Sequence, residues 1–169
     1  MHILFLLILF SLFNVLYAGE FCEIERKTLS SEVKYTIQES IKVEDLDGHV
    51  IRIFKTETNH KNQKKNCEGL KILKTDFFGV SDYINKSGSV YGYSIATYED
   101  GSKIFSKING TAQSPMDQSK NGIVMLTITI TGGTGKYKGV IGFGNGKTEF
   151  NPETGYSAGT TSLSYYINK

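Results

Sequence analysis

Two acidic residues interrupt strand-like segments of this 169-residue chain and are its candidate catalytic groups. Glu39 lies in VKYTIQESIKV, residues 33–43, on the face that is otherwise apolar if the segment alternates as a β-strand. Asp76 lies in a similar setting in KTDFF. A carboxyl group that points into an apolar interior has a raised pKa and can exchange a proton with an apolar ligand. Alternatively, Glu39 has only a structural role. A β-bulge or the end of the sheet would then turn its side chain toward water, or a lysine or tyrosine would pair with it.

Aromatic side chains supply the candidate ligand contacts. Aromatic residues on strands usually belong to a core or line the interior of a barrel. Four aromatic residues on predicted strands are therefore candidates to contact a ligand: Tyr35, Tyr91, Tyr93 and Phe105.

The remaining reactive residues do not form a recognisable catalytic set. His49 and His60 each adjoin a predicted turn or loop, and neither is near a Ser or Cys in a known motif. A Ser-His-Asp or Cys-His hydrolase is therefore not indicated. Cys22 and Cys67 lie far apart in the sequence without a local histidine, which favours a disulfide bond over a zinc site. We expect no metal and no cofactor.

The glycine-rich stretch TGGTGKYKGVIGFGNG, residues 131–146, could in principle cradle a phosphate group. A P-loop needs a glycine five positions before its Gly-Lys pair and a Ser or Thr after the lysine, but this chain has Ile130 and Tyr137 there. A dinucleotide site needs a helix next, and the glycines at 142, 144 and 146 disfavour one. The stretch instead predicts a strand, a tight turn and a second strand.

Charge gives little indication of a nucleic-acid partner. The formal net charge is only +2, whereas nucleic-acid-binding proteins concentrate Lys and Arg on one face. The basic run HKNQKKN, residues 60–66, contains no aromatic side chain on which a base could stack, so a solvated loop is the simpler interpretation.

The first 18 residues, MHILFLLILFSLFNVLYA, carry no charged side chain and predict a signal peptide that is cleaved after Ala18. The apolar run is shorter than the roughly 20 residues of a transmembrane helix. A cysteine pair suits an oxidising compartment. We therefore expect export to the periplasm or the outside of the cell, without stable membrane insertion, and a single domain over residues 19–169.

After residue 18 the chain reads as short strands separated by turns, and no helix is indicated. Eight segments show strand composition or alternation: residues 33–43, 49–58, 70–78, 90–98, 102–108, 122–131, 146–150 and 156–168. Short strands at this spacing predict an antiparallel sandwich or barrel, and a closed barrel leaves no edge strand exposed. We predict an all-β fold, a single antiparallel eight-stranded barrel.

Two segments resemble a known superfamily. ITGGTGKYKGVIGFG, residues 130–144, is similar to the glycine-spaced segment of the allene oxide cyclase and dirigent barrels and of small exported bacterial proteins like them. YEDGSKIFSKINGT, residues 98–111, resembles the upstream segment of the bacterial members. The resemblance implies an eight-stranded barrel with an apolar cavity, trimeric in the plant members. It assigns no catalytic residue, since Glu39 matches no motif of the family.

These observations leave three functions open. The first is a non-enzymatic exported barrel that binds a small apolar molecule or a partner surface. The second is a cofactor-free cyclase or isomerase in which Glu39 or Asp76 steers an apolar substrate among tyrosines. The third is a structural or interaction module whose barrel is filled by its own side chains.

Overall fold

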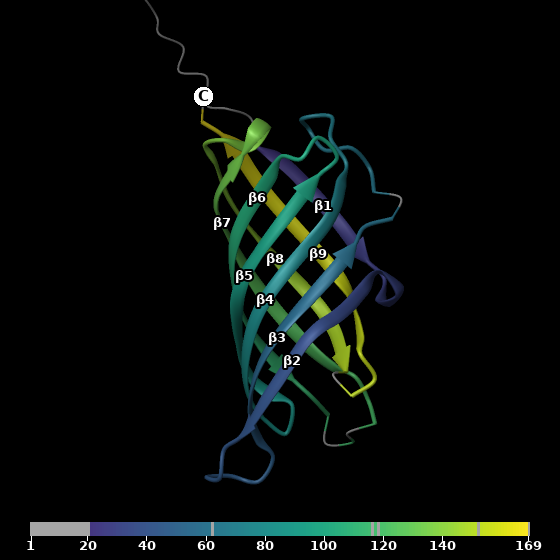
Figure 1. The fold of residues 1–169 in the computed structure, drawn as a ribbon, viewed down its shortest axis with the longest axis vertical. Coiled ribbons are helices and arrows are strands. Elements are labelled where there is room, and N and C mark those ends of the chain that lie inside the picture. The colour runs from purple at the N-terminus through teal and green to yellow at the C-terminus, as the bar shows by residue number, and fades with distance from the viewer. Residues whose placement is uncertain (1–20, 62, 116, 118, 152, 169) are drawn as a thin grey trace, which may run out of the picture.

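The computed structural model describes residues 21–168, except for positions 62, 116, 118 and 152 (Figure 1). The predicted signal peptide, residues 1–18, lies outside the described residues. The elements run in the order β1 (Cys22–Thr28), η1 (Ser30–Glu32), β2 (Val33–Lys42), β3 (His49–Asn59), β4 (Ile72–Ile84), β5 (Ser87–Tyr98), β6 (Lys103–Gln113), β7 (Gly122–Thr134), η2 (Gly135–Tyr137), β8 (Val140–Asn151) and β9 (Tyr156–Ile167).

All nine strands belong to one antiparallel sheet, in the order β1-β9-β8-β7-β6-β5-β4-β3-β2. The predicted all-β antiparallel class is confirmed, and each of the eight predicted segments contains or overlaps a strand. The ninth strand, β1, has the sequence CEIERKT. Its buried face includes Arg26 as well as Cys22 and Ile24, and a charged residue on the inner face hides the apolar alternation that marks the other strands.

The sheet is curled but not closed, which corrects the predicted eight-stranded barrel. The short 3₁₀ turn η1 breaks the first stretch of strand into two parts, which pair with opposite ends of the sheet, β1 with β9 and β2 with β3. No ladder joins β1 to β2 within the described part of the chain. Only residues 29–32 separate these two edge strands, and the Ser157 N–H of β9 donates a hydrogen bond of 3.4 Å to the Oγ of Ser30, the first residue of η1. The curled sheet therefore surrounds an interior, as Figure 1 shows.

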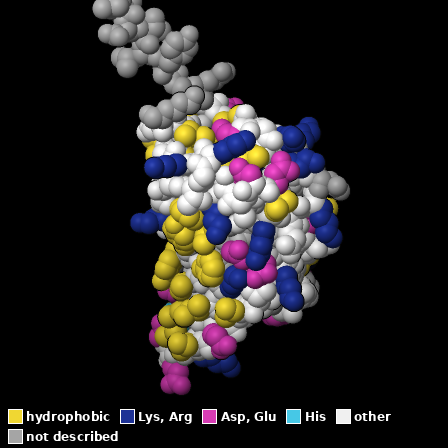
Figure 2. Space-filling view, turned by 45° about the horizontal axis from the view of Figure 1, so that its top comes forward, with side chains coloured by type: hydrophobic (Ala, Val, Ile, Leu, Met, Phe, Trp, Pro, Cys, Tyr) yellow, Lys and Arg dark blue, Asp and Glu magenta, His cyan; other side chains and the backbone are white. Residues whose placement is uncertain are grey.

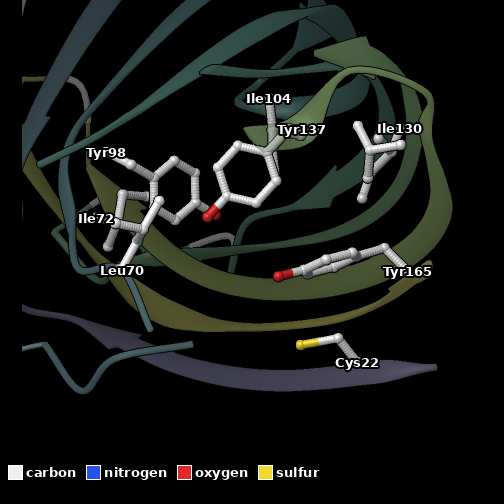
Figure 3. Packing of buried hydrophobic residues seen from close by; sticks show 9 residues of the cluster. Cys22, Leu70, Ile72, Tyr98, Ile104, Ile130, Tyr137 and Tyr165 are labelled. Atoms are coloured by element: carbon white, nitrogen blue, oxygen red, sulfur yellow. The ribbon is translucent and has the colours of Figure 1, made fainter. Parts of the chain in front are cut away.

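The largest buried cluster lies at the β1 and η2 end of the sheet. It contains three tyrosines that are almost completely buried, Tyr98, Tyr137 and Tyr165. The hydroxyl groups of Tyr137 and Tyr165 point to the same side (Figure 3), where the Asn66 side chain donates hydrogen bonds of 2.6 and 3.0 Å to them. A second cluster, with Val90 and Phe150 among its members, packs separately.

The glycine-rich stretch forms the strand, turn and strand that the sequence predicts. The turn η2 joins β7 to β8, and Gly135 has a φ of 59°, a conformation that glycine adopts without strain. A Cβ atom at Gly135 would also lie 2.4 Å from Ser102 Oγ. The turn leaves Lys136 and Lys138 exposed and inserts Tyr137, which has no exposed surface, into the core. Gly135 thus permits the tight turn that buries this ring.

Cys22 and Cys67 form a disulfide bond, as predicted, with their Cα atoms 6.0 Å apart. The bond ties the edge strand β1 to the loop between β3 and β4. An edge strand is paired with a neighbour on one side only. The disulfide gives β1 a covalent attachment in addition to its pairing with β9.

Candidate functional site

A cavity of about 220 Å³ lies inside the curled sheet and is lined by side chains from all nine strands. Because successive side chains of a strand point to opposite faces, alternate residues line this interior where a strand is regular. On β6, for example, Ile104, Ser106 and Ile108 line the cavity, whereas Lys103 and Lys107 are exposed.

Most of the lining is apolar or aromatic, and none of the described residues in it carries a carboxylate. The aromatic members are Tyr35, Phe54, Phe77, Tyr83, Tyr98 and Phe150. Burial raises the pKa of the Tyr35 and Tyr83 hydroxyls, so both stay neutral at physiological pH. Among the described residues of the lining, Arg26 alone carries a permanent charge.

Arg26 lies on the inner face of β1. Its Nη2 donates a hydrogen bond of 2.8 Å to the Tyr98 hydroxyl, and its guanidinium lies 5.8 Å from the centre of the Tyr98 ring. Among the described residues, no carboxylate forms an ion pair with Arg26. Since a guanidinium has five N–H donors, most of the donors of Arg26 remain available to a further partner.

His60 lines the same part of the cavity, one residue after β3. Its Nε2 is 2.9 Å from Thr75 Oγ1, and its buried Nδ1 has no hydrogen-bond partner among the described residues. Burial, and then the positive charge of Arg26, lower the pKa of His60 to about 4, although Glu32 acts in the opposite direction. His60 is therefore neutral at physiological pH and offers one free ring nitrogen.

Glu39, the first candidate catalytic acid, is exposed and does not line the cavity. A shift in the β2–β3 register between Tyr35 and Ile37 marks a β-bulge at Thr36. Tyr35 before the bulge lines the cavity, whereas Ile37 after it is 51% exposed. One extra residue exchanges the two faces of a strand, so Glu39 lies on the outer face with Ile37.

Asp76, the second candidate acid, also faces away from the cavity. Its neighbour Phe77 lines the interior, and the Asp76 carboxylate lies 3.1 Å from Lys55 Nζ and 3.0 Å from Lys74 Nζ on the outer face. Both lysines also pair with Glu57, at 2.6 and 3.4 Å. Partial burial raises the pKa of Asp76, but the two lysines outweigh it and hold the pKa below its usual value. A carboxylate kept ionised in this network has the environment of a structural ion pair.

The four aromatic candidates divide between the two faces of the sheet. Tyr35 lines the cavity. Tyr91 and Tyr93 are 51% and 37% exposed, and Phe105 stacks on Tyr93 with ring centres 6.4 Å apart. On β5 the cavity is lined by the even-numbered positions such as Val90, so the odd-numbered tyrosines must face outward. These three rings therefore lie on the outer face of the sheet, away from the cavity.

His49 takes part in an outer ion pair at the start of β3. Its ring nitrogens lie 2.5 Å from Asp45 Oδ1 and 2.7 Å from Asp82 Oδ1. The hydrogen bond to Asp45, and then that to Asp82, raise the pKa of His49. His49 and His60 thus occupy opposite electrostatic environments, and only His60 belongs to the cavity.

The basic run 60–66 contributes to a groove outside the cavity. Lys61, Lys64 and Lys65 line this groove together with acidic and basic residues of β1. The groove and the cavity have two lining residues in common, Arg26 and Tyr98. This hydrogen-bonded pair is therefore the boundary between the interior and the outer surface.

Arg26 and His60 are the site residues that the sequence analysis missed. A signal was present for His60, because Phe54, Thr56, Thr58 and His60 follow one another at every second position and all line the cavity. The signal for Arg26 was weaker, because the sequence alone does not show which face of the strand an arginine occupies until the pairing of β1 is known.

The fold and site define an all-β protein whose single curled sheet surrounds a small, mainly apolar cavity with one cation in its wall. No family model, curated protein or solved structure matches this chain. The described residues contain no group of three or more His, Cys, Asp or Glu side chains that could hold a metal ion. They also contain no helix that is long and apolar enough to cross a membrane.

Proposed function

We propose that this protein is a non-enzymatic binding protein that holds a small apolar molecule inside its curled sheet. The observation that carries the proposal is the cavity of about 220 Å³, lined mainly by apolar side chains. Ligand sites are typically concave and apolar with a few polar groups that fix orientation, and Arg26, His60 and Tyr98 supply such groups here.

The other two functions have less support. A cyclase or isomerase that used Glu39 or Asp76 would need the acid beside its substrate, but both carboxyl groups lie on the outer face. A module filled by its own side chains would leave no cavity of this size, because protein interiors are packed closely.

The proposal is tested by filling the cavity. Ser106 is buried on the inner face of β6, so Ser106→Phe places a ring in the space that a ligand would use. We expect the purified wild-type protein to release an apolar compound into organic solvent, identified by mass spectrometry, and to bind added octan-1-ol in calorimetry. Ser106→Phe should lose both properties.

Lys107→Phe is the matched control, because it adds the same ring to the next residue, which is exposed on the outer face. It should retain ligand as the wild type does. Wild-type protein that releases no apolar compound and binds no octan-1-ol would overturn the proposal, as would equal binding by Ser106→Phe.

We also propose that the protein is exported and is related to the allene oxide cyclase and dirigent barrels. The disulfide between Cys22 and Cys67 supports an oxidising compartment. The strand, turn and strand over residues 130–144 support the relation. A homo-oligomer, a trimer by the same resemblance, would have apolar surface available, since Phe78 pairs with Tyr93 on the outer face and both are exposed. Figure 2 shows hydrophobic side chains gathered along one side of the molecule.

A further inference from the structure

Arg26 lies at the boundary of the mainly apolar cavity and is the only permanent cation among the described residues that line it. The chain has only two arginines, and the other, Arg52, does not line the cavity and donates from Nε to Ser40 Oγ at 3.1 Å. No lysine of the described part of the chain lines the cavity. A partly buried charge is stable only with compensating partners, and among the described residues Arg26 makes one hydrogen bond, to the neutral Tyr98 hydroxyl.

The groups around Arg26 favour an anionic partner. Glu32 is the acidic residue of the connection between β1 and β2, but its carboxylate accepts hydrogen bonds from the Leu29 N–H at 2.9 Å and from the Lys61 N–H at 2.7 Å. His60, neutral at physiological pH, has a free Nδ1 that can donate a hydrogen bond in the appropriate tautomer. The site therefore combines one permanent cation with a neutral hydrogen-bonding group and no competing carboxylate in the lining.

We propose that the cavity binds a small apolar carboxylic acid, with its carboxylate on Arg26 and its hydrocarbon part among the apolar side chains of the interior. This inference rests on the proposed function and names the class of ligand. An arginine binds a carboxylate through two parallel N–H···O bonds, which fixes the orientation of the acid. One cation balances one negative charge, which suits a carboxylate better than a doubly charged phosphate monoester.

The position of Arg26 suits a ligand that has a charged group at one end and a hydrocarbon part at the other. Arg26 and Tyr98 line both the cavity and the outer groove, so a carboxylate on Arg26 lies at the boundary of the interior. The hydrocarbon part then extends toward Phe54, Phe77 and Phe150. A cavity of about 150 Å³ holds benzene, so the cavity of about 220 Å³ suits a ligand of about nine non-hydrogen atoms. Octanoate is close to this size.

The test compares octanoate with octan-1-ol, which has the same chain but no charge, by isothermal titration calorimetry at pH 7. We expect the wild-type protein to bind octanoate at least tenfold more tightly, because hydrogen bonds to charged groups are stronger than neutral ones. Arg26→Met should lose this preference and still bind octan-1-ol. Arg26→Lys should keep part of it, since the charge remains but the two-pronged geometry is lost.

Lys27→Met is the matched control, because Lys27 is the next residue of β1 and is exposed. It should bind octanoate as the wild type does. The inference is overturned if wild-type protein binds the two compounds equally, or if Arg26→Met keeps the preference. The wild-type comparison decides the matter even if Arg26→Met does not fold. Binding of octan-1-ol without a preference for octanoate leaves the proposed function intact, whereas binding of neither compound removes both.

Discussion

At the scale of single residues, burial and neighbouring charges give the two described histidines opposite properties. Burial keeps His60 neutral in the wall of the cavity, whereas the carboxylates of Asp45 and Asp82 raise the pKa of His49 on the outside. The difference matters for ligand binding, because a protonated His60 would add a second positive charge next to Arg26.

The first prediction concerns the titration of His60. Its pKa in the folded protein is about 4, below the usual 6.5, so between these values the unfolded chain binds a proton that the folded protein does not. The free energy of unfolding therefore decreases as the pH falls from about 6.5 toward 4. NMR titration of the imidazole signals should place His60 well below 6.5 and His49 above it.

A His60→Gln variant separates this effect from other acid-sensitive groups. The pH dependence of its stability between about 6.5 and 4 should be weaker than that of the wild type, measured by chemical denaturation at several pH values. If His60 titrates near 6.5, the partly buried environment described for it is wrong.

At the scale of elements, single irregularities decide which side chains the strands present. The bulge at Thr36 moves Glu39 to the outer face, and the turn η2 directs Tyr137 into the core between two exposed lysines. The loop between β3 and β4 acts together with η2, because Asn66 bonds the hydroxyls of both Tyr137 and Tyr165 and also accepts the Leu70 N–H at 3.0 Å.

The second prediction is that Asn66→Ala destabilises the protein by about 1–3 kcal/mol, because the substitution removes the donor to two buried tyrosine hydroxyls. The Tyr165 hydroxyl keeps its hydrogen bond to Glu68, so the loss falls mainly on Tyr137. Urea denaturation measures the change. Lys64→Ala in the same loop is the control, since Lys64 is exposed and its removal should change stability by at most about 0.5 kcal/mol. Equal effects of the two substitutions would show that the Asn66 hydrogen bonds do not hold this end of the fold.

At the scale of the whole molecule, the open sheet has two edge strands, β1 and β2, and each is paired with a neighbour on one side only. β1 and β2 do not pair with one another, and the disulfide anchors β1 to the loop that follows β3. The bond joins residues 45 positions apart, so it also restricts the unfolded chain.

The third prediction is that the double variant Cys22→Ser, Cys67→Ser loses about 4 kcal/mol of stability, by the loop-closure estimate for a bond of this span. Denaturation of the variant and of the wild type with and without a reducing agent measures the loss. Reduced wild type and the double variant should agree. An unchanged midpoint in both would mean that the sheet holds its edge without the disulfide.

The sequence by itself determined the secondary structure class, eight of the nine strands, the turn in residues 131–146 and the cysteine pair. These features depend on local alternation, on glycine and on residue chemistry, all of which are visible in short segments. The sequence also pointed to Tyr35, which lines the cavity.

Only the tertiary structure decided which face of each strand is inside and how the sheet ends. The face depends on register, and one bulge at Thr36 reverses it for the rest of β2, including Glu39. Closure of the sheet depends on whether the two edge strands, β1 and β2, pair with each other. No pattern within either short segment encodes that pairing. The place of Arg26 in the wall of the cavity follows from the pairing of β1 with β9, a contact between the two ends of the domain.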